Sequence, residues 1–486
     1  MNLQGIIFPL LGNLSSLQTL DLSNNALAGT IPPQLGELPR LQVLWLYRNQ
    51  LKGTFPPTLS ACRGLYDMDL SYNQLRGSIP PELSRLTSLK YLELGVNNLT
   101  GTIPRALGNM SSLVGLYLSE NDLTGTIPPE LGLLLQLKEL SLYMNQLSGL
   151  IPPQLGQLHR LQVLWLNDNQ IQGTLPPELG ALPQLKELSL YMNQLSDLEL
   201  GNNSLHGSIP PELGMLTKLQ VLYLYTNNLE GTIPRSLRNL SALTDLELAR
   251  NNLAGTIPPE LGMLAHLQTL YMFENHLSGS IPSSLTNLSK LNELALSNNQ
   301  LSGNILWDIG TKLSNLQYLS LWANQLSGNI PKSIGNCSRL KVFLLSQNWL
   351  SGMVPMEIGK LRHLTLLKLS QNQLVSTSRN TLAFLNALTN CSHLKTIAVS
   401  ENRLAGVLPP SIGQLSSNLF HLNLSENMIG GTITQEIANL TNITYLDLGH
   451  NLFRGTIPSE IKRLRMLERL HLNGNKLDGS IPSEIG

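Results

Sequence analysis

The chain has 486 residues, of which 13% are charged, and its 32 basic residues balance 32 acidic ones. This neutral balance predicts no nucleic-acid partner, because binding to phosphate backbones needs an excess of Lys and Arg. No apolar run approaches the roughly 18 residues of a membrane span, and residues 1–5 lack the basic and apolar regions of a signal peptide, so neither feature is predicted in the chain as given.

An asparagine returns along the chain at a nearly constant interval, and 15 of its 19 successive spacings are 24 residues. The asparagines of this ladder are Asn25, Asn49, Asn73, Asn97, Asn121, Asn145, Asn169, Asn193, Asn203, Asn227, Asn251, Asn275, Asn299, Asn324, Asn348, Asn372, Asn402, Asn427, Asn451 and Asn475. A fixed period of 20 to 50 residues predicts a stack of structural repeats that bury their apolar sides against one another.

One repeat, residues 41–65, shows how a coil is built. Leu44-Trp45-Leu46 alternates as a short strand, with the leucines facing inward and Trp45 facing outward. Asn49 follows at the turn, where its amide can both donate and accept, so we expect it to satisfy backbone groups of adjacent coils. Gly53 then supplies a tight backbone, and Pro56-Pro57 fixes an extended segment that ends pairing.

The pattern LxxLxxLxLxxNxLxGxIPxxLGxL runs through the whole chain, and most of it is seen plainly in residues 246–264, LELARNNLAGTIPPELGML. This pattern resembles the plant-type leucine-rich repeat, and the Gly-x-Ile-Pro segment is the part that resembles the plant subclass. The resemblance implies an α/β repeat solenoid, a right-handed leucine-rich repeat superhelix with a parallel concave β-sheet and about 20 coils of mostly 24 residues.

The step from Asn193 to Asn203 is only ten residues long. A parallel crossover needs about a dozen residues or more, and only seven lie between Leu190 and Leu198. Two neighbouring strands cannot both form there without distortion, so we expect a kink, a bulged-out strand or two separate blocks. The predicted organisation is a leucine-rich repeat block at 1–195, an irregular short repeat at 196–203 and a second block at 204–486.

The step from Asn372 to Asn402 is long, and it gives a 30-residue repeat at 373–402. Phe384, Leu385 and Leu388 in this repeat have helical spacing. The Phe-Leu-x-x-Leu-x-Asn-Cys stretch that contains them resembles the long repeat of the plant receptor kinase subfamily that senses microbial peptides.

Both ends fall within a repeat, and no cysteine-bearing cap precedes or follows the stack. Family members that this chain resembles carry a signal peptide, caps, a membrane helix and often a kinase. The expectation is therefore a fragment of a receptor ectodomain, whose parent protein lies at the extracellular face of the plasma membrane or in the apoplast.

The outward strand positions hold 15 of the chain's 24 aromatic residues. Exposed Tyr and Trp give a recognition surface contact area at little entropic cost, although aromatic residues also suit strands for purely structural reasons. The outward aromatic residues are densest in residues 223–273, where acidic and basic residues lie among them. The predicted ligand-binding residues on the concave face are Tyr223, Tyr225, Glu247, Arg250, Tyr271, Phe273 and Glu274.

Seven Asn-x-Ser/Thr sequons share one convex position, where a glycan would not obstruct the sheet. These glycosylation candidates are Asn13, Asn109, Asn239, Asn287, Asn336, Asn390 and Asn439. Cys62, Cys337 and Cys391 replace a core leucine in their coils, so we expect small buried side chains and not disulfides or ligands. Outward carboxylates such as Asp69 and Glu93 are expected to be solvated charges. No catalytic motif, metal site or cofactor is predicted.

Three functions remain open from the sequence. The first is an extracellular module that binds a peptide or protein on its concave face, as part of a receptor-like kinase or receptor-like protein, together with a leucine-rich repeat co-receptor. The second is a stand-alone secreted leucine-rich repeat protein that acts as an interaction partner or inhibitor. The third is a truncated product without activity of its own.

Overall fold

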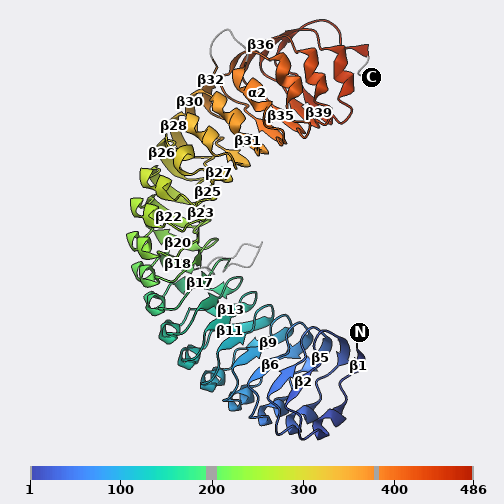
Figure 1. Ribbon diagram of the computed structural model, residues 1–486, viewed down its shortest axis with the longest axis vertical. Helices are drawn as coiled ribbons and strands as arrows, with labels where there is room; N and C mark the ends of the chain where they lie inside the picture. The colour runs from blue at the N-terminus through green and yellow to red at the C-terminus, as the bar shows by residue number, and fades with distance from the viewer. Residues whose placement is uncertain (1–2, 193–204, 377–381, 484–486) are drawn as a thin grey trace. The chain divides into compact units, whose positions relative to one another are not determined.

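The computed structural model describes residues 3–192, 205–376 and 382–483, and the chain divides into two compact units, Met1–Leu253 and Ala254–Gly486. Each unit is a stack of parallel coils (Figure 1), so the predicted α/β repeat solenoid with parallel concave strands is confirmed in each. Among the described residues no helix has both the length and the apolar character of a membrane span.

Every coil begins with a short strand, here called a concave strand, that pairs in parallel with the corresponding strands of neighbouring coils. In the first unit these are β2 (Thr19–Asp21), β4 (Val43–Trp45), β6 (Asp67–Asp69), β8 (Tyr91–Glu93), β10 (Gly115–Tyr117), β12 (Glu139–Ser141), β14 (Val163–Trp165), β17 (Glu187–Ser189), β19 (Val221–Tyr223) and β21 (Asp245–Glu247). In the second unit they are β23 (Thr269–Tyr271), β25 (Glu293–Ala295), β27 (Tyr318–Ser320), β29 (Val342–Leu344), β31 (Leu366–Lys368), β33 (Thr396–Ala398), β35 (His421–Asn423), β37 (Tyr445–Asp447) and β39 (Arg469–His471).

A second strand follows the ladder asparagine in most coils and forms lateral sheets that the sequence analysis did not predict. In the first unit these are β1 (Gln4–Ile6), β3 (Ala26–Gly29), β5 (Gln50–Thr54), β7 (Gln74–Gly77), β9 (Asn98–Thr102), β11 (Asp122–Thr126), β13 (Gln146–Gly149), β15 (Gln170–Ile171), β16 (Gly173–Thr174), β18 (Leu205–Ser208) and β20 (Asn228–Gly231). Strand β22 (Asn252–Thr256) contains the division between the units. In the second unit they are β24 (His276–Ser280), β26 (Gln300–Asn304), β28 (Gln325–Asn329), β30 (Trp349–Met353), β32 (Gln373–Val375), β34 (Ala405–Val407), β36 (Met428–Gly431), β38 (Leu452–Gly455) and β40 (Lys476–Leu477).

The return segment of most coils is a 3₁₀ helix, and many of these helices begin at the second proline of the Ile-Pro-Pro segment, where a missing N–H costs nothing. The first unit has η1 (Pro9–Asn13), η2 (Pro33–Glu37), η3 (Pro57–Ala61), η4 (Pro81–Arg85), η5 (Arg105–Asn109), η6 (Pro129–Leu133), η7 (Pro153–Gln157), η8 (Pro177–Ala181), η9 (Pro211–Met215) and η10 (Arg235–Asn239). The second has η11 (Pro259–Met263), η12 (Ser283–Asn287), α1 (Ile309–Lys312), η13 (Lys332–Asn336), η14 (Met356–Lys360), α2 (Ala383–Leu388), η15 (Pro410–Gln414), η16 (Gln435–Asn439) and η17 (Ser459–Arg463).

The asparagine ladder bonds as predicted. Asn73 Oδ1 accepts from Leu51 N at 3.0 Å, and Asn73 Nδ2 donates to Leu46 O at 3.0 Å, both in the preceding coil. The same Nδ2 lies 3.1 Å from Leu70 O in its own coil. The Asn73 amide therefore closes its own turn and ties it to the previous coil, and Asn97 makes the same set of bonds.

The irregular repeat expected at 196–203 lies within residues 193–204, which are outside the described residues, so the predicted block boundaries remain predictions. The concave strands that precede and follow residues 193–204 pair directly. These are β17 and β19, and Leu188 lies opposite Leu222. Asn227 Nδ2 donates to Leu190 O at 3.0 Å, but no described residue donates to Asn227 Oδ1. Asn227 in the coil of β19 thus keeps the hydrogen bond that a ladder asparagine donates to the preceding coil, here the coil of β17.

The long repeat contains the helix that its spacing predicts. Helix α2 buries Phe384, Leu385 and Leu388. The three cysteines are also buried and unpaired, as expected. Burial raises the pKa of the Cys62 thiol to about 11 and that of Cys337 to about 12, so both are protonated packing groups at neutral pH.

Candidate functional site

Most concave strands present at least one flanking residue to solvent, while their central apolar side chain is buried. On β14, for example, Leu164 is buried and Trp165 is only half-buried. The residue before each described ladder asparagine adopts a left-handed backbone, with φ between 50° and 67°, as Asp168 and Arg250 do. Most residue types adopt this conformation at some energetic cost, whereas Asp and Asn tolerate it, which makes Asp168 a well-suited occupant.

The predicted ligand-binding residues divide between the two units. Tyr223 ends β19, Tyr225 follows it, Glu247 ends β21 and Arg250 is exposed, all in the first unit. The remaining three, Tyr271, Phe273 and Glu274, belong to the second unit.

In that second unit Tyr271 and Phe273 have ring centroids 6.0 Å apart, and the Tyr271 hydroxyl donates to Glu293. The two groups of predicted residues lie in different units, and the role of each in binding remains a prediction.

The structure adds three rings to the two predicted tyrosines of the first unit. Tyr191 stacks on Tyr225 with centroids 4.3 Å apart and planes inclined by 10°. Tyr223 meets both rings by an edge, at 6.3 Å from Tyr191 and 6.2 Å from Tyr225. Tyr143 and Trp165 form an edge-to-face pair at 6.1 Å. We call Tyr143, Trp165, Tyr191, Tyr223 and Tyr225 the aromatic cluster.

Sequence reasoning placed Tyr191 among the outward aromatics but outside the predicted site. Its ring reaches Tyr225 because β17 and β19 are neighbouring strands. In the sequence the two tyrosines are ten residues further apart than the normal 24-residue period. The signal that could have found this contact is the recurrence of Leu-x-Leu-Tyr in Leu188–Tyr191 and Leu222–Tyr225, which aligns the two tyrosines if the short repeat contributes no concave strand.

The hydroxyls of the cluster remain protonated. Burial, together with charge repulsion from Asp245 and Glu247, raises the pKa of Tyr223 to about 12. Burial likewise raises the pKa of Tyr225 and of Tyr191 above the ordinary value. These phenols are therefore neutral hydrogen-bonding groups with a large apolar ring, the combination that recognition surfaces use most.

A hollow of about 230 Å³ opens between these rings. It is lined by Tyr143, Met144, Trp165, Asn167, Asp168, Ser189, Tyr191 and Tyr223. Ser189 Oγ donates to Asn167 Oδ1 at 3.0 Å, and Asn167 Nδ2 donates to Asp168 Oδ2 at 2.6 Å, so the polar floor is connected. The hollow is large enough for one side chain of a ligand, and its walls are held in place by these bonds.

Carboxyl groups gather on neighbouring concave strands of the first unit, and they are less solvated than the sequence suggested. Asp69 on β6 lies opposite Glu93 on β8 in the strand register. Burial, together with repulsion from Asp69 and Asp67, raises the pKa of Glu93 to about 7. On the next strands, Tyr117 Oη donates to a Glu139 carboxylate oxygen at 2.5 Å. This part of the concave face is therefore half-buried and acidic.

Comparison with known proteins decides the family. The family description "Leucine-rich repeat region" matches residues 47–232, and "Leucine rich repeat" matches 314–374 and 392–453. The structure of the plant peptide hormone receptor RGFR1 in complex with RGF2 superposes with a TM-score of 0.88 at 35% identity, covering 100% of this chain and 79% of that one. This chain belongs to the leucine-rich repeat family.

Other relatives of this leucine-rich repeat protein are plant receptors too. The Arabidopsis receptor kinase HAESA, solved with the peptide hormone IDA and the co-receptor SERK1, is 35% identical with a TM-score of 0.84, and the match covers 97% of this chain and 80% of the solved HAESA chain. The Arabidopsis thaliana kinase EFR is 43% identical and the Oryza sativa subsp. japonica protein Xa21 42% identical, over 17% and 18% of this chain. These matched stretches span 8% of each curated relative.

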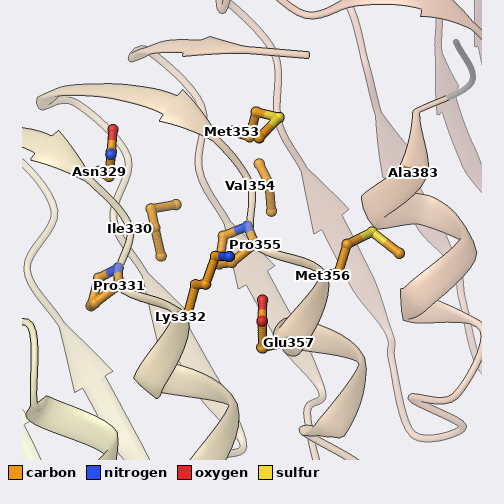
Figure 2. Close-up of a pocket in the computed structure, with 10 residues that line it drawn as sticks. All are labelled: Asn329, Ile330, Pro331, Lys332, Met353, Val354, Pro355, Met356, Glu357 and Ala383. Carbon is orange, nitrogen blue, oxygen red and sulfur yellow. The ribbon is translucent and has the colours of Figure 1, made fainter. Parts of the chain in front are cut away.

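A second hollow of about 410 Å³ lies in the other unit of this leucine-rich repeat protein, on the lateral side (Figure 2). Its lining comes from two successive turns, Asn329–Lys332 and Met353–Glu357, and from Ala383 at the start of α2. Ile330 and Val354 form its buried apolar wall, while Met353 and Met356 are about half exposed. Sequence reasoning did not predict it. Residues 377–381, which precede α2, lie outside the described residues, and we assign this hollow no ligand.

The glycosylation candidates all lie on exposed parts of the return segments. Asn13, Asn109, Asn239, Asn287, Asn336 and Asn439 are the last residues of their 3₁₀ helices, and Asn390 follows α2 by two residues. All seven side chains are exposed. As for metals, the described part of the chain contains no group of three or more His, Cys, Asp or Glu side chains arranged to hold an ion.

Proposed function

We propose that this chain is the extracellular recognition module of a receptor-like kinase or receptor-like protein, and that it binds a peptide on the concave face. The observation that carries the proposal is the aromatic cluster, which is built by neighbouring strands of one rigid sheet in the first unit. An extended peptide lying across these strands can place side chains between the rings.

Likeness to known receptors supports this proposal. RGFR1 and HAESA were solved with peptide hormones, and both align with nearly the whole of this chain at 35% identity. The HAESA complex also contains a co-receptor, so we propose a leucine-rich repeat co-receptor as a second partner. The proposed location is the extracellular face of the plasma membrane, with glycans at the exposed sequons of the return segments.

The two predicted groups of residues are proposed as separate contact areas. Tyr223, Tyr225, Glu247 and Arg250 contribute in the first unit, and Tyr271, Phe273 and Glu274 in the second. In both groups the rings supply contact area and the charged side chains fix the position of the peptide along the sheet.

A randomised dodecapeptide library, selected against the full chain, tests the proposal. We expect a selected peptide to lose about 30-fold in affinity on Tyr223→Ala with Tyr225→Ala, because central aromatic anchors contribute about 2 kcal/mol or more. A Tyr271→Ala, Phe273→Ala variant measures the second group independently. Affinities are measured by calorimetry, and circular dichroism checks that each variant is folded.

Trp307→Ala is the matched control, since Trp307 is 80% exposed and lies beside α1, away from the concave strands. Its affinity should equal that of the unmodified chain. A library that yields no binding peptide would contradict the proposed function. Selected peptides that bind both aromatic variants at full affinity would contradict the proposed surface.

A further inference from the structure

The hollow in the aromatic cluster combines rings with a negative charge. Four of its lining side chains are aromatic, Asp168 is its one charged lining residue among those described, and none of the described residues lining it is basic. Aromatic faces carry negative electrostatic potential, so ring faces and a carboxylate favour the same kind of ligand group.

The charges that act on the tyrosines of the hollow have the same sign as Asp168. Asp168 and Glu247 act on the Tyr191 hydroxyl, and Asp245, Glu247 and Glu187 act on the Tyr223 hydroxyl, in each case raising the pKa of the phenol. On the other side of the hollow, Tyr143 Oη donates to Glu120 Oε1 at 3.0 Å. The concave face around the hollow is therefore acidic on both sides.

We propose that this hollow is the subsite for a cationic side chain, arginine or lysine, of the bound peptide. The proposal rests on the proposed function and adds the chemistry of one ligand position to it. The cation enters between Tyr143 and Tyr191, lies against the face of Trp165 or Tyr191, and donates to Asp168 Oδ1. The other oxygen, Oδ2, is held by Asn167 at 2.6 Å, which keeps the carboxylate in place.

Other occupants fit these residues less well. An apolar side chain would fill the space between the rings but would cover Asp168 Oδ1 without giving it a partner, and burying a charged oxygen that lacks a hydrogen bond is costly. An acidic or sulfated group would meet the repulsion of Asp168, Glu187 and Glu247 together. A cation gains both the ring interaction and a charge-assisted hydrogen bond.

The test uses the full chain and a peptide selected from the library described above. We expect selected peptides to share an Arg or Lys at one position, and replacement of that Arg by citrulline, which has nearly the same shape without the charge, to reduce affinity about tenfold. When the receptor chain carries Asp168→Asn, replacing the peptide's Arg by citrulline should change the affinity less than twofold. Asn tolerates the left-handed backbone of residue 168, where φ is 53°, so this variant keeps the turn.

Asp122→Asn is the charge-matched control, because Asp122 lies on the lateral strand β11. It should retain the tenfold preference for Arg over citrulline. As a second variant, Trp165→Leu should reduce that preference by removing the ring while keeping an apolar side chain.

The outcomes separate the two proposals. Peptides that bind at the aromatic cluster with no shared cation, or that bind equally well with citrulline, would overturn the cationic subsite and leave the proposed function standing. If no peptide is retained at all, the proposed function itself fails. Retention of the full Arg preference in Asp168→Asn would also overturn the assignment of Asp168.

Discussion

Replacing Asn169 by leucine is expected to reduce the free energy of unfolding by about 3 kcal/mol, because buried groups that lose their partners each cost about 1–3 kcal/mol. Asn169 is fully buried. Its Oδ1 accepts from Leu147 N at 3.0 Å, and its Nδ2 donates to Leu142 O at 3.0 Å. Leucine has a similar volume but satisfies neither group.

Urea unfolding followed by circular dichroism measures the loss, and hydrogen exchange at Leu147 N–H reports the local effect. The same substitution at Asn25 is the control. Asn25 bonds Leu3 N at 2.8 Å in an exposed setting, so water can replace its amide and the cost should stay below about 1 kcal/mol. Equal losses at both positions would show that burial of the ladder does not determine its contribution.

Gly132→Ala is expected to cost about 2–3 kcal/mol, because it overpacks a contact that cannot relax by side-chain rotation. A Cβ at Gly132 would lie 2.4 Å from Gln154 O and 2.8 Å from Gln154 C, which are backbone atoms of η7 in the next coil. The 3₁₀ helices η6 and η7 would have to move apart. The measurement is again the urea midpoint of the full chain.

Gly430→Ala is the control for this substitution, since the nearest atom to its Cβ would be Leu452 O at 3.5 Å and its φ is not left-handed. Alanine restricts the unfolded chain more than glycine, so this variant should be as stable as the original chain or slightly more stable. The account of coil spacing would be wrong if Gly132→Ala behaved in the same way.

The repeat could be predicted from the sequence because its signals are strictly periodic. One ladder asparagine, such as Asn73, recurs at the same position of successive coils, and the side chains of the Leu-x-Leu strands alternate with a period of two. The lateral strands were missed, because segments such as Gln50–Thr54 contain a glycine and lack clear alternation. Their pairing depends on neighbouring coils more than on their own residues.

The candidate site was predicted only in part, for a physical reason. Tyr223 and Tyr225 were identified from their outward positions, but Tyr191 becomes their neighbour only through the pairing of β17 with β19. The ten-residue step hid this pairing, because the sequence does not show which of two Leu-x-Leu segments enters the sheet. The solvation of Glu93 was misjudged likewise, because its partial burial and its closeness to Asp69 and Asp67 on the neighbouring strand arise only when the strands pair.

Photo-crosslinking of a selected peptide tests the central claim most directly. A benzophenone-bearing copy of the peptide is irradiated with the full chain, and mass spectrometry locates the attachment sites. Binding on the aromatic cluster predicts crosslinks within residues 139–145, 163–168, 187–192 and 221–226, and loss of these crosslinks in the Tyr223→Ala, Tyr225→Ala variant. Crosslinks confined to the 3₁₀ helices or the lateral strands would contradict recognition on the concave face.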